Sequence, residues 1–349
     1  MREQFIHAKK VLENHGIVAF PTETVMGLAI LFDDRLAYDK LNIVKERPED
    51  KPYTMMVKSI DEIEKYAFID ESIKRVINRF MPGSITLLLK AKDNVPNYVT
   101  HNTGIIGIRI PTNFEAVELL KELNKPLLVP SANKSGQKPA YDVEEAKSIF
   151  GDEVDTYIDG DCEGLVPSTI VDLTGDMPRL IRKGPVSFEA INAIYFGHKF
   201  EDTVICYLIK DDSVLMLFRN KKEIDINKGK WIGVGGHIEF GETPSHAIVR
   251  EVKEETSLRM NSYKEMATIT FFFNDDVEVM HVFTCIDYSG KVNYNCPEGT
   301  LKWIPIDELF EINLWEGDKL FLEPILSGEP YFEMHMRYDG DSLVEYKKI

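Results

Sequence analysis

A short acidic stretch, GHIEFGETPSHAIVREVKEETSL (236–258), constrains the fold of this 349-residue chain more than any other feature. It contains only two strongly basic side chains but five glutamates: Glu239, Glu242, Glu251, Glu254 and Glu255. Thr243 followed by Pro244 predicts the start of a helix, because Thr caps the first turn well and Pro fits within it. We expect this helix to run to about Thr256.

The predicted helix gathers carboxylates on one side. Glu251, Glu254 and Glu255 stand at positions i, i+3 and i+4, so they share a face, and like charges at this spacing destabilise a bare helix. A solvated acidic face is one explanation. A divalent cation with oxygen ligands is the other, and it would turn the repulsion into coordination. We therefore predict a site for Mg²⁺, with Mn²⁺ as the alternative, that acts on a phosphorylated substrate.

The rest of the chain predicts two α/β domains. Its length exceeds that of most single cores, and 44% apolar and 28% charged residues are typical of globular proteins. Periodicity is lost in AIYFGHKFED (193–202), so we place the boundary between 1–197 and 198–349. Two strands around an Asp-Asp-Ser turn open the second domain. In the first domain, buried strands are predicted at 17–20, 85–89, 105–110, 127–129 and 168–173, with helices at 60–66 and 73–80.

Net charge argues against a large nucleic-acid surface. The chain carries −17, with 25 Lys and Arg against 30 Asp and Glu up to residue 200, and 16 against 28 beyond it. The second domain therefore needs a cation more than the first if both handle nucleotides. No apolar run reaches the roughly 20 residues that span a bilayer, so we expect a cytoplasmic protein without a membrane partner. The four scattered cysteines predict free thiols.

The acidic stretch resembles the Nudix box, G-x5-E-x7-R-E-U-x-E-E-x-G-U, where U is aliphatic. The match comprises Gly236, Glu242, Arg250, Glu251, Val252, Glu254, Glu255 and Leu258. The resemblance implies an α/β/α sandwich that hydrolyses nucleoside diphosphate linkages. It also implies a magnesium site made by Glu251, Glu254, Glu255, the Gly236 carbonyl and a downstream acid, for which Glu298 is our first choice and Glu278 our second.

Two further expectations concern the box itself. Arg250 is expected to orient the carboxylates by pairing with Glu242. Ser257 stands where the pattern has Gly, so we expect strain there, because Gly normally lets the chain leave a helix.

Segments on both sides of the box are similar to MutT-type diphosphatases, which remove oxidised purine nucleoside triphosphates. Trp315 and Asp318 match positions that read the oxidised base in that group, whereas Gly317 replaces a second acid. The similarity implies a preference for substrates such as 8-oxo-dGTP. An ordinary core or rim aromatic is the alternative explanation for Trp315.

Polar side chains in the first domain follow the ends of apolar strands, where α/β sheets build ligand sites. Cations and hydroxyls in one cleft would suit a polyphosphate and a small carboxylate. The candidates are Thr22, Lys45, Arg47, Lys51, Arg109, Ser131, Asn133, Ser135, Ser168, Thr169 and Arg182.

These segments, over about residues 8–190, resemble the YrdC/TsaC family of threonylcarbamoyl-AMP synthases, whose fold is a twisted open sheet with helices. The KxRP and SAN signatures correspond to Lys45, Arg47, Ser131 and Asn133. The resemblance implies that L-threonine, bicarbonate and ATP are joined into threonylcarbamoyl-AMP for the t6A base of tRNA, with other t6A-pathway proteins as partners. Lys45, Arg47 and Arg182 would contact phosphate or carboxylate, and Thr22 the amino acid.

One departure keeps a different class of function open. Met26 stands where the family usually has Tyr beside the substrate cleft. The alternative is that the first domain is a non-catalytic RNA-binding or regulatory module attached to an active hydrolase. The acidic balance of residues 1–200 disfavours RNA binding, and direct contact with tRNA is not expected.

Overall fold

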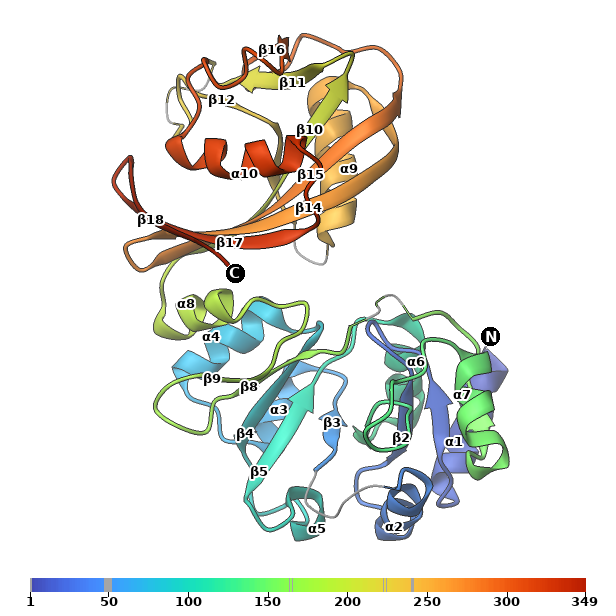
Figure 1. Cartoon of the computed structure of the whole chain (residues 1–349). Coiled ribbons are helices and arrows are strands. Elements are labelled where there is room, and N and C mark those ends of the chain that lie inside the picture. The colour runs from blue at the N-terminus through green and yellow to red at the C-terminus, as the bar shows by residue number, and fades with distance from the viewer. Residues whose placement is uncertain are drawn as a thin grey trace. The chain divides into compact units, whose positions relative to one another are not determined.

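The computed structural model describes residues 2–46, 52–162, 164, 166–221, 223, 225–239 and 242–349. The chain divides into two compact units, Met1–Gly197 and His198–Ile349. Both are α/β, as predicted (Figure 1). Among the helices of the described residues, none is long and apolar enough to cross a membrane.

The first unit is an open sheet covered by helices. Its strands follow the order β7-β1-β2-β6-β3-β5-β4-β8-β9. They are β1 (Val18–Phe20), β2 (Gly27–Leu31), β3 (Thr54–Met56), β4 (Ile85–Lys90), β5 (Ile105–Arg109), β6 (Leu127–Leu128), β7 (Thr156–Tyr157), β8 (Thr169–Asp172) and β9 (Arg179–Arg182). The helices are α1 (Arg2–Glu13), α2 (Arg35–Val44), α3 (Ile60–Tyr66), α4 (Glu71–Phe80), α5 (Asn97–Thr100), α6 (Phe114–Leu123), α7 (Val143–Phe150) and α8 (Phe188–Phe196), with a 3-10 turn η1 (Gly151–Glu153).

Alternation along the strands gives this unit two cores. On β1, Val18 and Phe20 pack into the cluster that α1 and α6 supply, whereas Ala19 packs into the cluster of α2, α3, α4 and α7. The strands and helices predicted for this unit are all present, with ends that differ by one or two residues. β3 pairs parallel with β5 and β4 pairs parallel with β8, whereas β4 pairs antiparallel with β5, so the start of β8 lies at the edge of the sheet where β5 ends.

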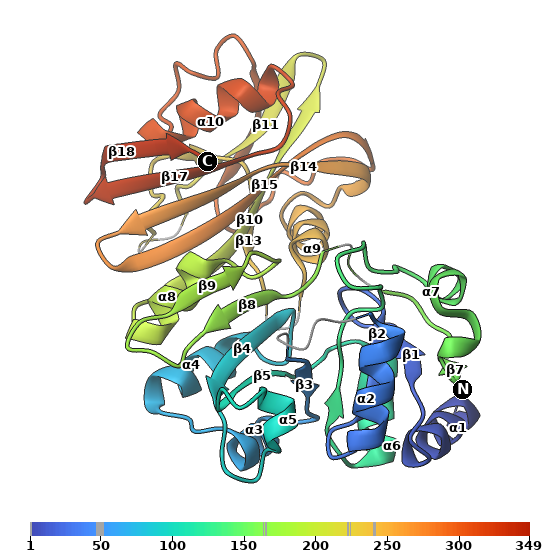
Figure 2. The same cartoon turned by 60° about the horizontal axis from the view of Figure 1, so that its bottom comes forward.

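The second unit is a sandwich of one sheet between two helices (Figure 2). Its strands are β10 (Phe200–Lys210), β11 (Ser213–Phe218), β12 (Trp231–Ile232), β13 (Val234–His237), β14 (Arg259–Phe273), β15 (Asp276–Ser289), β16 (Thr300–Pro305), β17 (Phe332–Asp339) and β18 (Ser342–Lys348). The helices are α9 (Pro244–Thr256) and α10 (Glu316–Leu326). On β10, Ile205 and Tyr207 face the cluster of α10, and Val204 and Cys206 face that of α9. The predicted α/β/α arrangement is confirmed.

Helix α9 begins and ends as its sequence predicts. The Thr243 side chain accepts a hydrogen bond from the His246 amide, Pro244 lies in the first turn, and the last helical residue is Thr256. Ser257 follows in the left-handed region, with φ of 62°. A side chain costs energy in this conformation, so the strain expected at Ser257 is present.

Candidate active sites

Strand ends of the first unit surround a cavity of about 170 Å³. Thr22 lies just after β1, Arg109 ends β5, and Arg182 ends β9. Ser131 and Ser168 also line the cavity. Five of the residues predicted to bind ligands therefore line one cavity, although they come from distant parts of the sequence.

Arg109 is buried and held in place by two neighbours. Its Nε donates to Glu23 Oε1 at 2.8 Å, and a second guanidinium nitrogen pairs with the same oxygen. Its Nη1 lies 3.2 Å from Thr24 Oγ1. Glu23 is also buried, and among the described residues its Oε2 finds no hydrogen-bond partner. Sequence reasoning assigned no role to Glu23, although it lies in the same TET segment as Thr22.

Arg182 provides a second guanidinium on the cavity wall. Its Nε donates to the Ser168 carbonyl at 3.0 Å, and its Nη2 to Ser168 Oγ at 3.1 Å. Burial, and then the neighbouring charge of Arg109, lower the pKa of Arg182 from its ordinary value. Two guanidiniums that repel each other in a partly enclosed space favour an anion between them.

Lys45, which the sequence predicts to be catalytic, does not line this cavity in the structure. Its ammonium is buried and donates to the carbonyls of Ser131 and Asn133, at 2.5 and 2.6 Å. The Ser131 hydroxyl in turn donates to Asn133 Oδ1 at 2.7 Å. A buried ammonium needs such partners. Lys45 therefore holds the loop that carries Ser131, and of the SAN residues only Ser131 reaches the cavity.

Two further residues that the sequence predicts to bind substrate make contacts away from the cavity. The Thr169 hydroxyl donates to the Val186 carbonyl at 2.8 Å and accepts from the Val186 amide at 2.9 Å, so it holds a turn. Ser135 contacts Lys45 through its backbone amide, and neither residue lines the cavity. Met26 does line it, as expected from the family's Tyr position. Arg47 and Lys51 lie outside the described residues.

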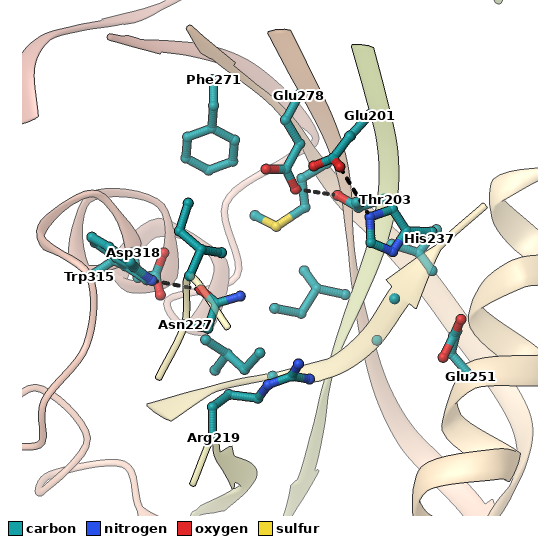
Figure 3. A pocket seen from close by; sticks show the side chains of 18 of the residues that line it. Glu201, Thr203, Arg219, Asn227, His237, Glu251, Phe271, Glu278, Trp315 and Asp318 are labelled. Atoms are coloured by element: carbon teal, nitrogen blue, oxygen red, sulfur yellow. Dashed lines mark hydrogen bonds and ion pairs between the residues drawn. The ribbon is translucent and has the colours of Figure 1, made fainter. Parts of the chain in front are cut away.

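The second unit contains a larger cavity, of about 400 Å³ (Figure 3). On one side it is lined by β13, where Gly236 faces the Glu251 carboxylate of α9. A Cβ on Gly236 would lie only 2.6 Å from Glu251 Oε1, so only glycine lets this carboxylate approach the strand.

Arg250 orients the acidic face of α9. It donates to both oxygens of Glu242, at 3.1 and 2.8 Å, and to Glu251 Oε1 at 2.7 Å. The expected Arg250–Glu242 pair is therefore present. Glu254 is more exposed, with Oε2 at 3.5 Å from Arg250.

Glu255 is the most buried acid of the box. Its Oε2 accepts from the Gly235 amide at 3.1 Å. Burial, and then the nearby charge of Glu298, raise the pKa of Glu255 to about 8. Glu298 itself is paired with Arg219, which also contacts Asp225 at 2.7 Å.

The acidic face fits a hard divalent cation in ligand type and charge. All its donors are oxygen atoms, and Glu251, Glu254 and Glu255 bring several negative charges to one helix face. With the side chains as they stand, however, no three His, Cys, Asp or Glu residues in the described part of the chain lie close enough to form a metal cluster. The second-choice acid, Glu278, accepts from the Thr203 hydroxyl at 2.8 Å.

The opposite side of the cavity is lined by Trp315 and Asp318. Trp315 Nε1 donates to Asn227 Oδ1 at 2.8 Å. Burial raises the pKa of Asp318 to about 7. A side chain at Gly317 would require Tyr338 and Met336 to shift, because a Cβ there would lie 2.5 Å from the Tyr338 hydroxyl and 2.7 Å from the Met336 sulfur.

Sequence reasoning missed Arg219 and Asn227. Both lie just beyond the β11 strand, in the segment RNKKEIDIN, and both line the cavity. Arg219 directly follows a strand, so the strand-end pattern used to choose candidate residues in the first unit would also have pointed to it. No sequence pattern marks Asn227 as a cavity residue, because its side-chain contact is to Trp315, which is 88 positions away along the chain.

Comparisons with known proteins agree with this architecture. The Sua5/YciO/YrdC family model, described as "Telomere recombination", matches residues 10–184, and the NUDIX domain model matches residues 199–323. A Mycobacterium tuberculosis protein named "Putative threonylcarbamoyl-AMP synthase" is 37% identical over 50% of this chain and 81% of its own length. An Escherichia coli protein named "Uncharacterized protein YciO" is 30% identical over 51% and 87%.

A solved structure is also similar. P. abyssi Sua5 complexed with L-threonine is 26% identical, covering 60% of this chain and 70% of that one with a TM-score of 0.54. This chain belongs to the Sua5/YciO/YrdC family and carries a NUDIX domain in its second unit.

Proposed function

We propose that the first unit joins L-threonine, bicarbonate and ATP into threonylcarbamoyl-AMP and pyrophosphate, for the t6A base of tRNA. The observation that carries this proposal is a pair of guanidiniums, the buried Arg109 and the more exposed Arg182, on the wall of one cavity. Relatives named as threonylcarbamoyl-AMP synthases, and a similar structure complexed with L-threonine, support it.

The main requirement for catalysing the proposed reaction is to stabilise the negative charge that develops on the phosphates. The threonine amine and bicarbonate form a carbamate with loss of water, and a carbamate oxygen then attacks the α-phosphorus of ATP. The bond to the bridging oxygen breaks, and pyrophosphate leaves with the electron pair. Arg109 and Arg182 would hold the phosphates and the developing charge. Thr22 and Ser131 would offer hydroxyls to the amino acid and nucleotide, and Lys45 would hold the Ser131 loop.

The test is synthesis by the purified full chain with each substrate omitted in turn, with products separated by chromatography. Arg182→Gln should lower synthesis by about a hundredfold, as for a lost charge-stabilising donor. Arg179→Gln is the matched control, because Arg179 lies on the same strand but is 73% exposed and pairs with Asp172. No adenylated product with all substrates present would favour a non-catalytic RNA-binding or regulatory module.

For the second unit we propose magnesium-dependent hydrolysis of nucleoside triphosphates, with oxidised purines such as 8-oxo-dGTP preferred. The observation that supports this proposal most directly is the position of two groups in one cavity. The acidic face of α9 lies on one side, and Trp315 and Asp318 lie on the other. Glu251, Glu254, Glu255 and Glu298 would hold Mg²⁺, which when bound supplies an activated water and neutralises phosphate charge. Trp315 would stack on the base, and Asp318 would meet the N7 position, which becomes a donor in 8-oxopurines.

The test is hydrolysis of 8-oxo-dGTP and dGTP by the full chain, with Mg²⁺ and with a chelator. We expect a higher kcat/KM for 8-oxo-dGTP and loss of both activities when the metal is removed. Equal efficiency on the two nucleotides would contradict base selection alone. Undiminished hydrolysis in the chelator would contradict the metal site.

A further inference from the structure

The turn between β11 and β12 presents Asn227 to the cavity of the second unit. This turn is well anchored. The backbone N–H of Asn227 donates to Asp225 Oδ1 at 3.0 Å. The other carboxylate oxygen of Asp225 accepts from Arg219 Nε at 2.7 Å. The Asn227 carbonyl accepts from the Lys230 amide at 2.9 Å. Asn227 therefore stands at a fixed place on the wall.

Trp315 fixes the orientation of the side-chain amide of Asn227. An indole N–H can only donate, so the 2.8 Å contact requires the oxygen of Asn227 to face the ring. Figure 3 shows Oδ1 turned to Trp315 and the nitrogen turned away from it, toward the open middle of the cavity. What Asn227 offers to a ligand is therefore an N–H donor.

Trp315 is itself held rigidly. Lys230 Nζ lies 4.8 Å from the centre of its ring and donates to Asn313 Oδ1 and the Leu314 carbonyl, both at 3.1 Å. Tyr338 packs edge-on at 6.2 Å between ring centres. The donor of Asn227 is thus preorganised before any ligand binds, and preorganised polar groups discriminate best.

We propose that Asn227 is a specificity-determining residue that selects purines with a carbonyl oxygen at C6 over those with an amino group there. This inference rests on the proposed function of the second unit. If Asp318 meets N7, the next polar group on the same base edge is the C6 substituent. The side-chain amide of Asn227 lines the same cavity as Asp318 and is hydrogen-bonded to Trp315.

The discrimination follows from donor and acceptor matching. A C6 carbonyl accepts from the Asn227 nitrogen, whereas a C6 amino group would place two donors opposite each other. Leaving a buried polar group unpaired costs about 1–3 kcal/mol, which corresponds to roughly a 5- to 150-fold difference.

The decisive variant is Asn227→Asp, which keeps the size of the side chain and one oxygen for Trp315 but replaces the donor with an acceptor. The nucleotide pair is 8-oxo-dGTP and 8-oxo-dATP, which share the C8 oxidation and differ at C6. We expect the kcat/KM ratio of 8-oxo-dGTP over 8-oxo-dATP to fall at least tenfold. Asn220→Asp is the control, because it adds the same charge to an exposed residue of the same segment that contacts Thr300 and does not line the cavity, and its ratio should stay unchanged.

A second measurement separates this inference from the proposed function. Calorimetric binding of 8-oxo-dGMP and 8-oxo-dAMP, without metal, needs no hydrolysis, so it still tests Asn227 if the protein hydrolyses neither triphosphate. Asn227→Leu removes the donor without adding charge and should reduce the same binding preference. An unchanged ratio in both variants, or no preference for 8-oxo-dGMP in the unmodified protein, would overturn the inference.

Discussion

At the scale of single residues, burial decides what each polar group can do. Lys45 and Arg109 are both buried cations, yet Lys45 is surrounded by backbone carbonyls and Arg109 by a carboxylate and a cavity. The first arrangement orders a loop, and the second leaves guanidinium donors near a space that an anion can enter. Two buried cations therefore differ in what their donors can reach: backbone carbonyls for Lys45, and a carboxylate beside a cavity for Arg109.

Asp318 provides a prediction about pH. Its pKa is about 7 when folded, above its ordinary 3.8, because burial disfavours the carboxylate. The folded state thus holds a proton that the unfolded state has released, and stability should fall as pH rises from about 4 to 7. Asp318→Asn cannot ionise, so at pH 7 it should be more stable than the unmodified protein by on the order of 3 kcal/mol, with little difference at pH 4.

Urea unfolding followed by tryptophan fluorescence checks this, because all three tryptophans, Trp231, Trp303 and Trp315, belong to the second unit. The control is Asp339→Asn, an exposed residue whose change should move stability by less than about 0.5 kcal/mol. A stability difference between Asp318→Asn and the unmodified protein that does not change with pH would contradict the assigned cause.

At the scale of elements, the acidic face depends on how α9 ends. The helix stops at Thr256, and Ser257 takes the left-handed conformation that reverses the chain into β14. Glu254 and Glu255 lie in this last turn, so the geometry of the helix end bears directly on two predicted metal ligands.

We predict that Ser257→Gly stabilises the second unit by about 1 kcal/mol, because glycine adopts positive φ without the cost that a Cβ imposes. The measurement is the urea midpoint of tryptophan fluorescence. Ser257→Ala keeps the Cβ and should bring no comparable gain. An equal gain from both substitutions would mean that the hydroxyl, not the backbone conformation, is the source of the strain.

At the scale of the whole molecule, each cavity is lined by residues of one compact unit only, among the residues that the structure describes. Threonylcarbamoyl-AMP contains a single phosphate in a mixed anhydride, so it lacks the diphosphate linkage that the second unit is proposed to cleave. Nothing in the chemistry requires the two proposed reactions to share an intermediate.

We therefore predict that the two activities separate. Glu255→Gln keeps the size of the side chain but removes a metal-binding charge, so hydrolysis should fall by at least about a hundredfold while synthesis persists. Arg182→Gln should show the reverse. Both assays are run on both variants at the same protein concentration, and a joint loss of the two activities in either variant would refute independence.

The local features of this chain were predictable from its sequence. The start and end of α9 and five strands of the first sheet (β1, β4, β5, β6 and β8) follow from capping, residue type and periodicity, which act over a few neighbouring residues, whereas β2, β3, β7 and β9 were not predicted. The Arg250–Glu242 pair was also predictable, because a helix and the turn before it bring the two together.

Only the tertiary structure decided which side chains face a cavity. Lys45 finds its partners 86 and 88 positions along the chain, and Asn227 finds Trp315 at a separation of 88. Thr169 turns its hydroxyl to Val186 because the start of strand β8 lies beside the segment that follows β9. Hydrogen bonds of this kind depend on which distant segments become neighbours in the fold, and the spacing of residues along the sequence does not determine that.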